Sequence, residues 1–374
     1  MRRISVFLVL AFAVGLLALA GCSRTEDHPL APATDEMALE NPPDAEKGWR
    51  HGSRHRGSIV VANRGSGSIS VLDARSGELE GTYALPYADG ESMPEPMYVN
   101  GVSYLKRVFV GDRANDRVVV FDSRTFEVVG TVPAGNGVFH QWVGDRGRRL
   151  WVNNDVDNTV TVIDTRRLEV LGTLEIPADL VAMGGKPHDV VVDHRGRFAY
   201  VTVLGIDGPN DYLLQYDARD FTEINRQPVG KDPHLALGKH TDLYVPAQNS
   251  DEVRVFDPTT LELNDIIEAP GAHGAAISPN GKYFYATNLP GGGADALLTI
   301  KTRTNEMIGE AVSTPYAVPH NIALNATGRM LFVTHSGGMA DQVTFYRVDR
   351  RSGVPEFAGE VTVGTNPFGL GYVY

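Results

Sequence analysis

Hydrophobic and polar residues alternate along most of the chain in short runs that are typical of β-strands. In residues 66–79 (SGSISVLDARSGEL) an alternating strand is followed by an aspartate, a polar turn and another short strand. The pattern recurs at 115–128, 157–170, 210–223 and 250–263, with degenerate copies at 294–307 and 341–354. Self-similarity of this kind predicts a repeat protein whose copies each form one supersecondary unit.

The repeated aspartate has a structural explanation. Its carboxylate can accept hydrogen bonds from turn amides two residues further on, so we predict turn stabilisation and no catalytic role. The residues concerned are Asp73, Asp122, Asp164, Asp217, Asp257 and Asp349.

Two further strands precede each copy, which gives four strands per repeat and a period in the forties. The strand directly before each copy lies at 58–63, 107–112, 149–154, 198–203, 242–247, 283–288 and 330–335. Four-stranded units of this length predict an all-β fold of β-propeller blades. First strands open near Met97, His140, His188, His234, His273, His320 and Phe368. The last opening is followed only by GLGYVY, and Ser58 begins on a second strand. We therefore predict a seven-bladed propeller over 58–374, closed by the C-terminal strand joining the N-terminal blade.

The strands FAYVTV (198–203) and RLWVNN (149–154), with VTVID following the latter, resemble those of the YVTN-type (surface-layer or YncE-like) propeller family. The resemblance covers nearly the whole mature chain and implies the fold. It does not imply an activity, because this architecture hosts lyases, lactonases, oxidoreductase domains and binding modules.

Charge and cysteine content exclude several classes of protein. The chain has 46 acidic and 34 basic residues and a formal charge of −12, so we expect no nucleic-acid partner. Its single cysteine excludes an intramolecular disulfide framework, a zinc ribbon and a CxxC redox centre.

That cysteine lies at the end of an apparent export signal. Arg2 and Arg3 precede an apolar stretch and the sequence Leu19-Ala20-Gly21-Cys22. This sequence resembles the lipobox of bacterial lipoproteins, which implies a signal peptide over 1–21 and lipidation of Cys22. An ordinary cleaved signal is the alternative. Residues 22–57 lack periodicity and are predicted to be a lipidated tether. Ser23 favours the outer membrane, since an aspartate there marks inner-membrane retention in many Gram-negative bacteria.

Candidate chemistry comes from histidines at the first-strand openings: His140, His188, His234, His273 and His320. First strands line the channel of a propeller, so these imidazoles should converge near one mouth. His335 ends the second strand of the His320 blade and should reach the same mouth. His194 and His240 fall in turns of the opposite face.

Converging neutral imidazoles suit Cu, Zn, Fe or Ni. Five or six rings cannot all bind one tetrahedral ion, so a subset, a polynuclear site or a substrate site is expected. Asp189, Asp232 and Asn321 lie beside ring histidines and are candidate hydrogen-bond partners of the ligands. Proton competition predicts that metal affinity falls near pH 6.5. The ring resembles the copper site in the propeller domain of nitrous oxide reductase, which favours copper. The Cys-containing cupredoxin portion of that enzyme is absent from this chain, so its full activity is not implied.

Weaker candidates surround this mouth. Arg64 and Arg113 can bind an anion or be solvated turn charges, and Met93 and Met97 can ligate Cu(I) or pack in loops. The leading hypothesis is a cell-envelope lipoprotein whose histidines bind copper for metal handling or redox chemistry. The alternatives are a non-catalytic scaffold that binds an envelope partner, with histidines that only brace the blades, and a propeller lyase or lactonase acting on a small ligand.

Overall fold

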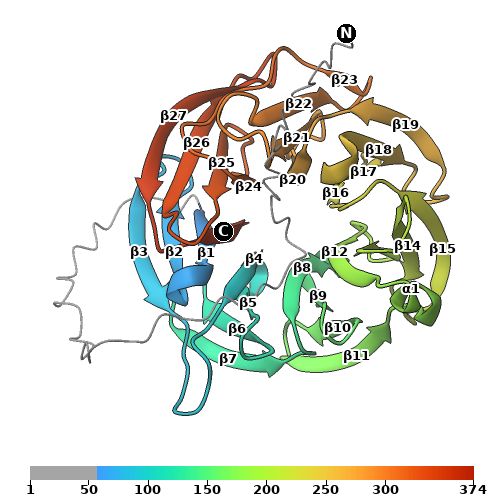
Figure 1. Cartoon of the computed structure of the whole chain (residues 1–374). Coiled ribbons are helices and arrows are strands. Elements are labelled where there is room, and N and C mark those ends of the chain that lie inside the picture. Colours follow the sequence, from blue (N-terminus) through green and yellow to red (C-terminus); the bar gives the residue numbers. More distant parts are fainter. Residues whose placement is uncertain (1–56) are drawn as a thin grey trace, which may run out of the picture. The chain divides into compact units, whose positions relative to one another are not determined.

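The computed structural model describes residues 57–374, which form seven four-stranded antiparallel sheets arranged around a central channel (Figure 1). The predicted signal peptide, Cys22 and nearly all of the predicted tether lie outside these residues. The blades follow one another along the chain, with the first strand of each next to the channel and the fourth at the rim. This arrangement confirms the predicted seven-bladed propeller.

The closing blade combines both ends of the propeller: β28 (Pro367–Val373) pairs with β1 (Ser58–Asn63), and β2 (Ser68–Asp73) and β3 (Leu79–Ala84) follow. The next two blades contain β4 (Pro96–Val102), β5 (Arg107–Asp112), β6 (Arg117–Asp122) and β7 (Val128–Pro133), then β8 (Val138–Gly144), β9 (Arg149–Asn154), β10 (Thr159–Asp164) and β11 (Glu169–Glu175).

The fourth and fifth blades contain β12 (Lys186–Val192), β13 (Phe198–Leu204), β14 (Asp211–Asp217) and β15 (Glu223–Val229), then β16 (Ala236–Leu237), β17 (Leu243–Ala247), β18 (Glu252–Phe256) and β19 (Leu263–Glu268). The last two contain β20 (Ala272–Ile277), β21 (Tyr283–Asn288), β22 (Leu297–Lys301) and β23 (Glu306–Met307), then β24 (Pro319–Leu324), β25 (Met330–His335), β26 (Gln342–Val348) and β27 (Pro355–Thr362).

Helical structure is confined to short segments. The helix α1 (Ala178–Ala182) lies between β11 and β12, and the 3-10 turns are η1 (Arg64–Ser66), η2 (Ser103–Leu105), η3 (Asp145–Gly147) and η4 (Gln248–Ser250). Within residues 57–374, no helix has the length and apolar character needed to cross a membrane.

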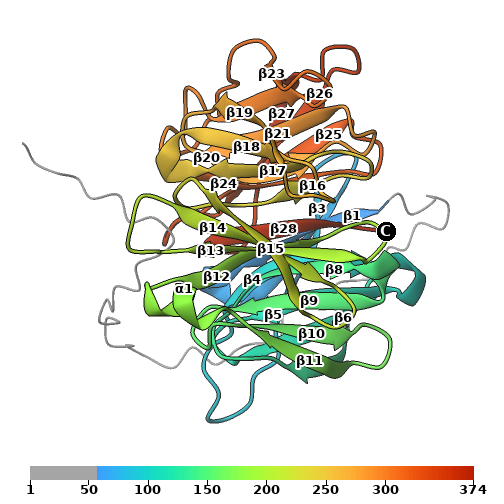
Figure 2. The same ribbon diagram turned by 90° about the vertical axis from the view of Figure 1, so that its right-hand side faces the viewer.

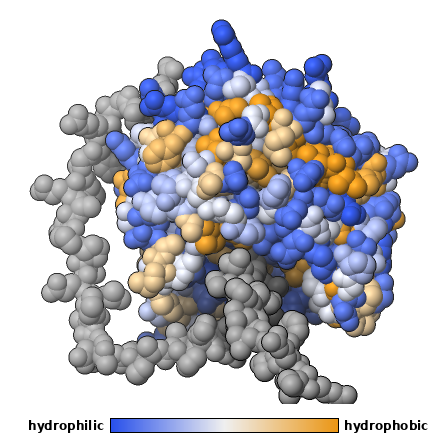
Figure 3. All heavy atoms as spheres, turned by 45° about the horizontal axis from the view of Figure 1, so that its top comes forward, coloured by the Kyte–Doolittle hydropathy of each residue, from blue (hydrophilic) through white to orange (hydrophobic). Residues whose placement is uncertain are grey.

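The hydrophobic core lies between neighbouring blades. In one cluster Val60 and Val71 of the closing blade pack with Val108 and Val119 of the next, and all four are buried. The middle strands are apolar on both sides because each blade face packs against another blade, whereas the rim strands alternate. On the side shown in Figure 3, the surface is largely hydrophilic, with apolar residues in scattered groups.

The repeated aspartates stabilise turns, as the sequence predicts. Oδ1 of Asp73 accepts hydrogen bonds from the amides of Arg75 (2.9 Å) and Ser76 (2.7 Å). Equivalent bonds to the amide two residues on occur at Asp122, Asp164, Asp217, Asp257 and Asp349.

The disc has two distinct faces. First strands begin on the side that carries α1, here called the histidine face, and end on the other, where the C-terminus lies (Figure 2). Strand β1 runs antiparallel to β28, with Ser58 opposite Val373. Gly57 therefore enters the propeller on the opposite face, where its carbonyl accepts a hydrogen bond from the Ala74 amide.

Candidate functional site

The predicted histidines meet in the channel. Ring centroids of His188 and His234 lie 4.5 Å apart, those of His234 and His273 3.9 Å, and those of His273 and His320 5.0 Å. The His140 ring lies 4.9 Å from that of His188. All five side chains are buried.

A β-bulge directs these side chains toward the channel. In six of the blades the pairing between first and second strands shifts register and leaves two first-strand residues unpaired. One of the two is in each case the residue named above at the opening of that first strand. A threonine of the second strand fixes the bulge in three blades, because its hydroxyl accepts the amide of the second bulge residue. These pairs are Thr202 with Asp189, Thr287 with Gly274, and Thr334 with Asn321.

The position of the bulge changes the repeat position assigned to one histidine, His140. In blade three the shift falls between Val138 and Gln141, whereas in blade four it falls between Pro187 and Val190. Phe139 is therefore the counterpart of His188, and His140 is the counterpart of Asp189. His140 reaches the cluster from the second bulge position, so the prediction that all five histidines share one repeat position is wrong for this residue.

Three of the histidines are placed to share an ion. His140, His188 and His234 each offer a ring nitrogen, and these nitrogens lie within 4.8 Å of one another. The Nε2 atoms of His188 and His234 are 3.2 Å apart. Two ligands of one tetrahedral ion at about 2.0–2.1 Å are separated by a similar distance.

Two carboxylates support this cluster. Oδ1 of Asp189 lies 3.0 Å from Nδ1 of His140, and its Oδ2 lies 3.9 Å from Nδ1 of His234. With its proton on Nδ1, His140 presents the Nε2 lone pair to the site. Asp232 Oδ1 lies 3.9 Å from Nε2 of His188.

Several buried polar atoms of the cluster have no hydrogen-bond partner among the described residues. They are Nε2 of His140, both ring nitrogens of His273 and Oδ1 of Asp232. Buried polar groups in native proteins nearly always have partners, and an unpaired one costs about 1–3 kcal/mol. Each of these atoms is thus available to bind a ligand or a water molecule.

Burial lowers the pKa of four imidazoles of the cluster and so favours their neutral form. It lowers the pKa of His188, His234 and His273 well below the usual 6.5, and the neighbouring imidazoles lower it further. Burial also lowers the pKa of His320 to about 4. The pKa of the Asp232 carboxyl is raised to about 6, first by burial and then by the charge of Asp211. Neutral imidazole is the form that binds metal ions.

Two predicted site residues are engaged elsewhere. Nδ1 of His335 lies 3.0 Å from the Ala317 carbonyl and its Nε2 lies 2.9 Å from the Thr344 hydroxyl, so neither nitrogen is available. The Asn321 side chain accepts the amide of Ile322 within its own bulge. His335 is absent from the three-histidine group.

Aromatic side chains pack beside the histidines in the channel, a position that the repeat pattern did not indicate. Met97, Tyr98, Phe139 and Phe368 form one buried cluster, and the Tyr98 ring stacks on His140 at 3.8 Å. All four occupy the unpaired bulge positions of their first strands, so they correspond to the histidines and their neighbours in the other blades. Met97 therefore packs in an apolar cluster, whereas Met93 is 54% exposed.

The mouth arginines have carboxylate partners. Arg64 pairs with Glu95 at 3.2 Å and lies over Phe368, whereas Arg113 pairs with Asp155 at 2.9 Å and lies over Phe139. His194 and His240 are exposed and line a common cavity on the opposite face.

Solved structures similar to this one are propellers of diverse activity. The periplasmic gluconolactonase of Pseudomonas aeruginosa superposes with a TM-score of 0.65 at 19% identity, over 85% of this chain and 99% of that chain. Hydrazine synthase of Kuenenia stuttgartiensis gives 0.60 at 17% identity, over 76% and 92% of the chains. The dihydro-heme d1 dehydrogenase NirN gives 0.57 at 16% identity, over 86% and 76%. These likenesses show the fold alone.

Among curated proteins, no match to the sequence is found. The family model described as lactonase, seven-bladed β-propeller, matches residues 48–275, which is more than half of the chain. The protein therefore belongs to the seven-bladed β-propeller lactonase family.

Proposed function

We propose that this protein binds a copper ion through His140, His188 and His234 in the channel, for metal handling or redox chemistry. The observation that carries the proposal is the group of three buried imidazole nitrogens within 4.8 Å of one another. Asp189 beside His140 matches the carboxylate–histidine pairs that orient metal ligands. His273, next to His234 and with both nitrogens unpartnered among the described residues, is the candidate fourth ligand.

The ligand chemistry favours copper. Imidazole nitrogens suit Cu, Zn, Fe and Ni, and affinities of divalent ions for a given nitrogen site peak at copper. The predicted lipid on Cys22 would hold the propeller at the outer membrane, where metal ions are exchanged with the exterior. An envelope protein that delivers or receives the ion would be its partner.

The test is metal analysis and calorimetric titration with Cu²⁺ and Zn²⁺ of protein purified without an affinity tag. We expect one copper per chain, and loss of stoichiometric binding in the His188→Gln/His234→Gln variant. The His194→Gln/His240→Gln variant is the matched control, because it removes two exposed histidines from the opposite face.

Copper bound equally by both variants would contradict the proposal. Loss of stability in His188→Gln/His234→Gln, without a change in metal content, would instead identify the histidines as braces between blades.

A second candidate is lactone hydrolysis at the same mouth, which the Asp232 carboxylate favours in a chain of this family. Its Oδ1 is buried and unpartnered among the described residues, and its pKa near 6 makes it a stronger base than an exposed aspartate. Asp232 would take a proton from a water molecule that attacks the lactone carbonyl. The ring C–O bond would then break, and the released alkoxide would accept a proton to give the hydroxy acid.

Titration of acid released from gluconolactone tests this candidate. We expect hydrolysis above the uncatalysed rate, with at least a tenfold loss in Asp232→Asn. Unchanged rates in Asp232→Asn would remove this residue from the reaction, and the absence of catalysis with and without added copper would exclude the candidate.

A further inference from the structure

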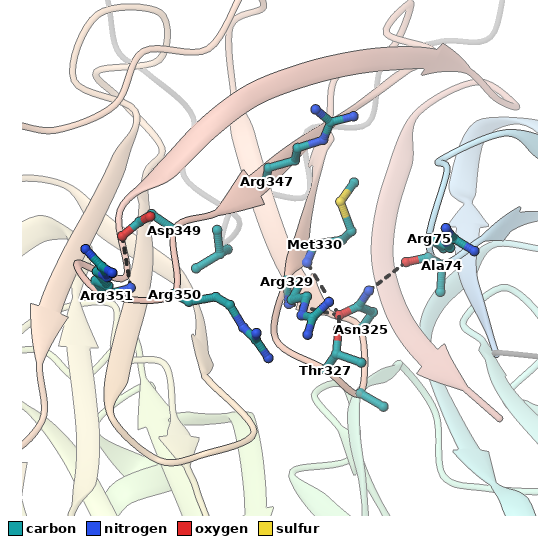
Figure 4. Close-up of a pocket in the computed structure, with 12 residues that line it drawn as sticks. Ala74, Arg75, Asn325, Thr327, Arg329, Met330, Arg347, Asp349, Arg350 and Arg351 are labelled. Atoms are coloured by element: carbon teal, nitrogen blue, oxygen red, sulfur yellow. Dashed lines mark hydrogen bonds between the residues drawn. The ribbon is translucent and has the colours of Figure 1, made fainter.

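A cleft on the opposite face has five arginines around it. Arg75, Arg329, Arg347, Arg350 and Arg351, here called the arginine cleft, line a cavity of about 760 Å³ with a single carboxylate, Asp349, among its lining residues. Figure 4 shows Arg350 extending from one wall toward the wall that carries Arg329 and Thr327.

No salt bridge within residues 57–374 involves the arginines of the cleft, and all five side chains are exposed. Two carboxylates lie near enough to interact with these charges, Asp73 with Arg75 and Asp349 with Arg351, and Oδ1 of Asp349 also accepts the amides of Arg351 and Ser352. On the histidine face, by contrast, Arg64, Arg113 and Arg117 are all paired with carboxylates. Five arginines against two aspartates leave the cleft with an excess of positive charge.

The floor of the cleft is apolar and fixed. Ala74, Met330 and Val348 are buried there. Asn325 ties the walls together, since its Nδ2 donates to the Ala74 carbonyl at 2.9 Å and its Oδ1 accepts from the Thr327 hydroxyl at 2.9 Å. A rigid apolar floor with arginine walls suits a phosphate group that is attached to an apolar or glycerol-like moiety.

The position of the cleft on the propeller favours a membrane lipid as the source of that phosphate. The first described residue of the propeller, Gly57, lies beside the arginine cleft. Its carbonyl accepts a hydrogen bond from the amide of Ala74, a residue that lines the cleft. Most lysines and arginines of residues 57–374 also lie in or beside the turns of this face. The predicted lipid anchor at Cys22 would join the propeller on this face, where Gly57 enters it.

We propose that the arginine cleft binds the phosphate headgroups of anionic membrane lipids and docks the propeller with its histidine face away from the bilayer. The cleft is separate from the histidine cluster, so the proposal stands independently of metal binding. Because the charges are exposed, the interaction should weaken as ionic strength rises.

The experiment is vesicle co-sedimentation of a chain starting at residue 23, which lacks the predicted acylation site. This chain retains all seven blades and the ring closure, which lie within residues 57–374. Vesicles contain phosphatidylcholine with or without phosphatidylglycerol. We expect binding only to the phosphatidylglycerol vesicles, and on the order of 10- to 100-fold weaker binding for Arg329→Gln/Arg347→Gln/Arg350→Gln.

The matched control is Arg124→Gln/Arg219→Gln/Arg303→Gln, which removes three exposed turn arginines of the same face in other blades. It should keep binding within about threefold. Equal loss in both variants would overturn the cleft as the binding site, and so would equal binding to both vesicle types. A third arm titrates inorganic pyrophosphate: binding that depends on the cleft, without vesicle binding, would overturn the lipid source. Unchanged thermal unfolding of the variants establishes that they fold.

Discussion

At the scale of single residues, Asp189 contacts more of the candidate site than any other carboxylate in the described chain. Its Oδ1 lies 3.0 Å from Nδ1 of His140 and accepts the amide of Val190, whereas its Oδ2 accepts the amide of Leu235 in the next blade. One carboxylate thus fixes a bulge, a neighbouring blade and the tautomer of a candidate ligand. An amide at this place offers only one acceptor oxygen.

Replacing the Asp189 carboxylate tests whether it orients the His140 ring for copper binding. We expect Asp189→Asn to weaken copper binding about 10- to 100-fold, because the amide cannot hold His140 and keep both backbone hydrogen bonds. Competition with a chromogenic chelator measures the affinity. Asn321→Ala is the control, since Asn321 occupies the same bulge position beside His320 without a carboxylate, and it should leave copper binding nearly unchanged. Equal copper affinity of wild type and Asp189→Asn would contradict this role.

The pH dependence of copper binding is a second prediction at this scale. Burial lowers the pKa of His188 and His234 well below 6.5, so protons begin to compete for their nitrogens only at lower pH. The sequence alone places the loss of affinity near 6.5, and the structure moves it toward acid. Chelator competition between about pH 7.5 and 4.5 should show constant affinity through pH 6.5 and a decline below it. A midpoint at 6.5 would indicate solvent-exposed ligands.

At the scale of elements, the second-strand threonine links adjacent blades. The Thr334 hydroxyl accepts the Asn321 amide at 3.1 Å within its own blade and donates to the Phe368 carbonyl of the closing strand at 2.7 Å. Thr287 makes the same two contacts, with Gly274 and with the carbonyl of His320. The threonine in the recurring strand motif therefore has a physical role in shaping the channel ring.

Thr334→Val tests this link with little change of volume. The substitution leaves a buried amide and a buried carbonyl without their partner, so we expect the free energy of unfolding to fall by about 1–3 kcal/mol. Chemical denaturation measures this change. Thr131→Val, on the exposed side of rim strand β7, should change the free energy by no more than about 0.5 kcal/mol. Similar values for the two variants would show that the hydroxyl contributes nothing to blade packing.

Regular elements could be predicted from the sequence where the alternation is long and unbroken. The second strands β1, β5, β9, β21 and β25 have the bounds that the pattern predicts. The helix α1 was not predicted, because five residues carry too little periodicity. Strands β16 and β23 contain only two residues each, and near them the pairing continues only as the isolated bridges Pro233–Ala247 and Leu297–Val312.

At the scale of the whole molecule, closure of the ring brings together residues that lie far apart in the sequence. Repeat phase brings the histidines together, so their convergence was predictable. The bonded state of His335 depends on contacts with Ala317 and Thr344 that no repeat pattern encodes. The arginine cleft was not predictable from the repeat pattern, because its residues come from both ends of the propeller sequence. Closure by β28 places Ala74 beside Asn325, 251 positions away.

Closure also concentrates neutral imidazoles in one buried place, which makes stability depend on acid. Burial holds the pKa of His188, His234 and His273 well below 6.5 and that of His320 at about 4, while unfolded histidines titrate near 6.5. Below pH 6.5 the unfolded chain therefore binds more protons than the folded one, and stability falls as pH decreases. Asp232 opposes this, because its raised pKa of about 6 lets the folded state bind the extra proton.

We therefore expect the metal-free protein to lose stability steeply between about pH 6 and pH 4.5. Four histidines less one aspartate leave a difference of about three protons, equivalent to about 4 kcal/mol per pH unit at the steepest point. Urea unfolding at a series of pH values in the presence of a chelator measures the slope. His320→Phe, which copies the residue of the closing blade at this position, should reduce the slope by about 1.4 kcal/mol per pH unit. His194→Phe, on the opposite face, should not. A flat profile down to pH 4.5 would mean that the histidine cluster opens to solvent, and that bound metal, rather than burial, holds it together.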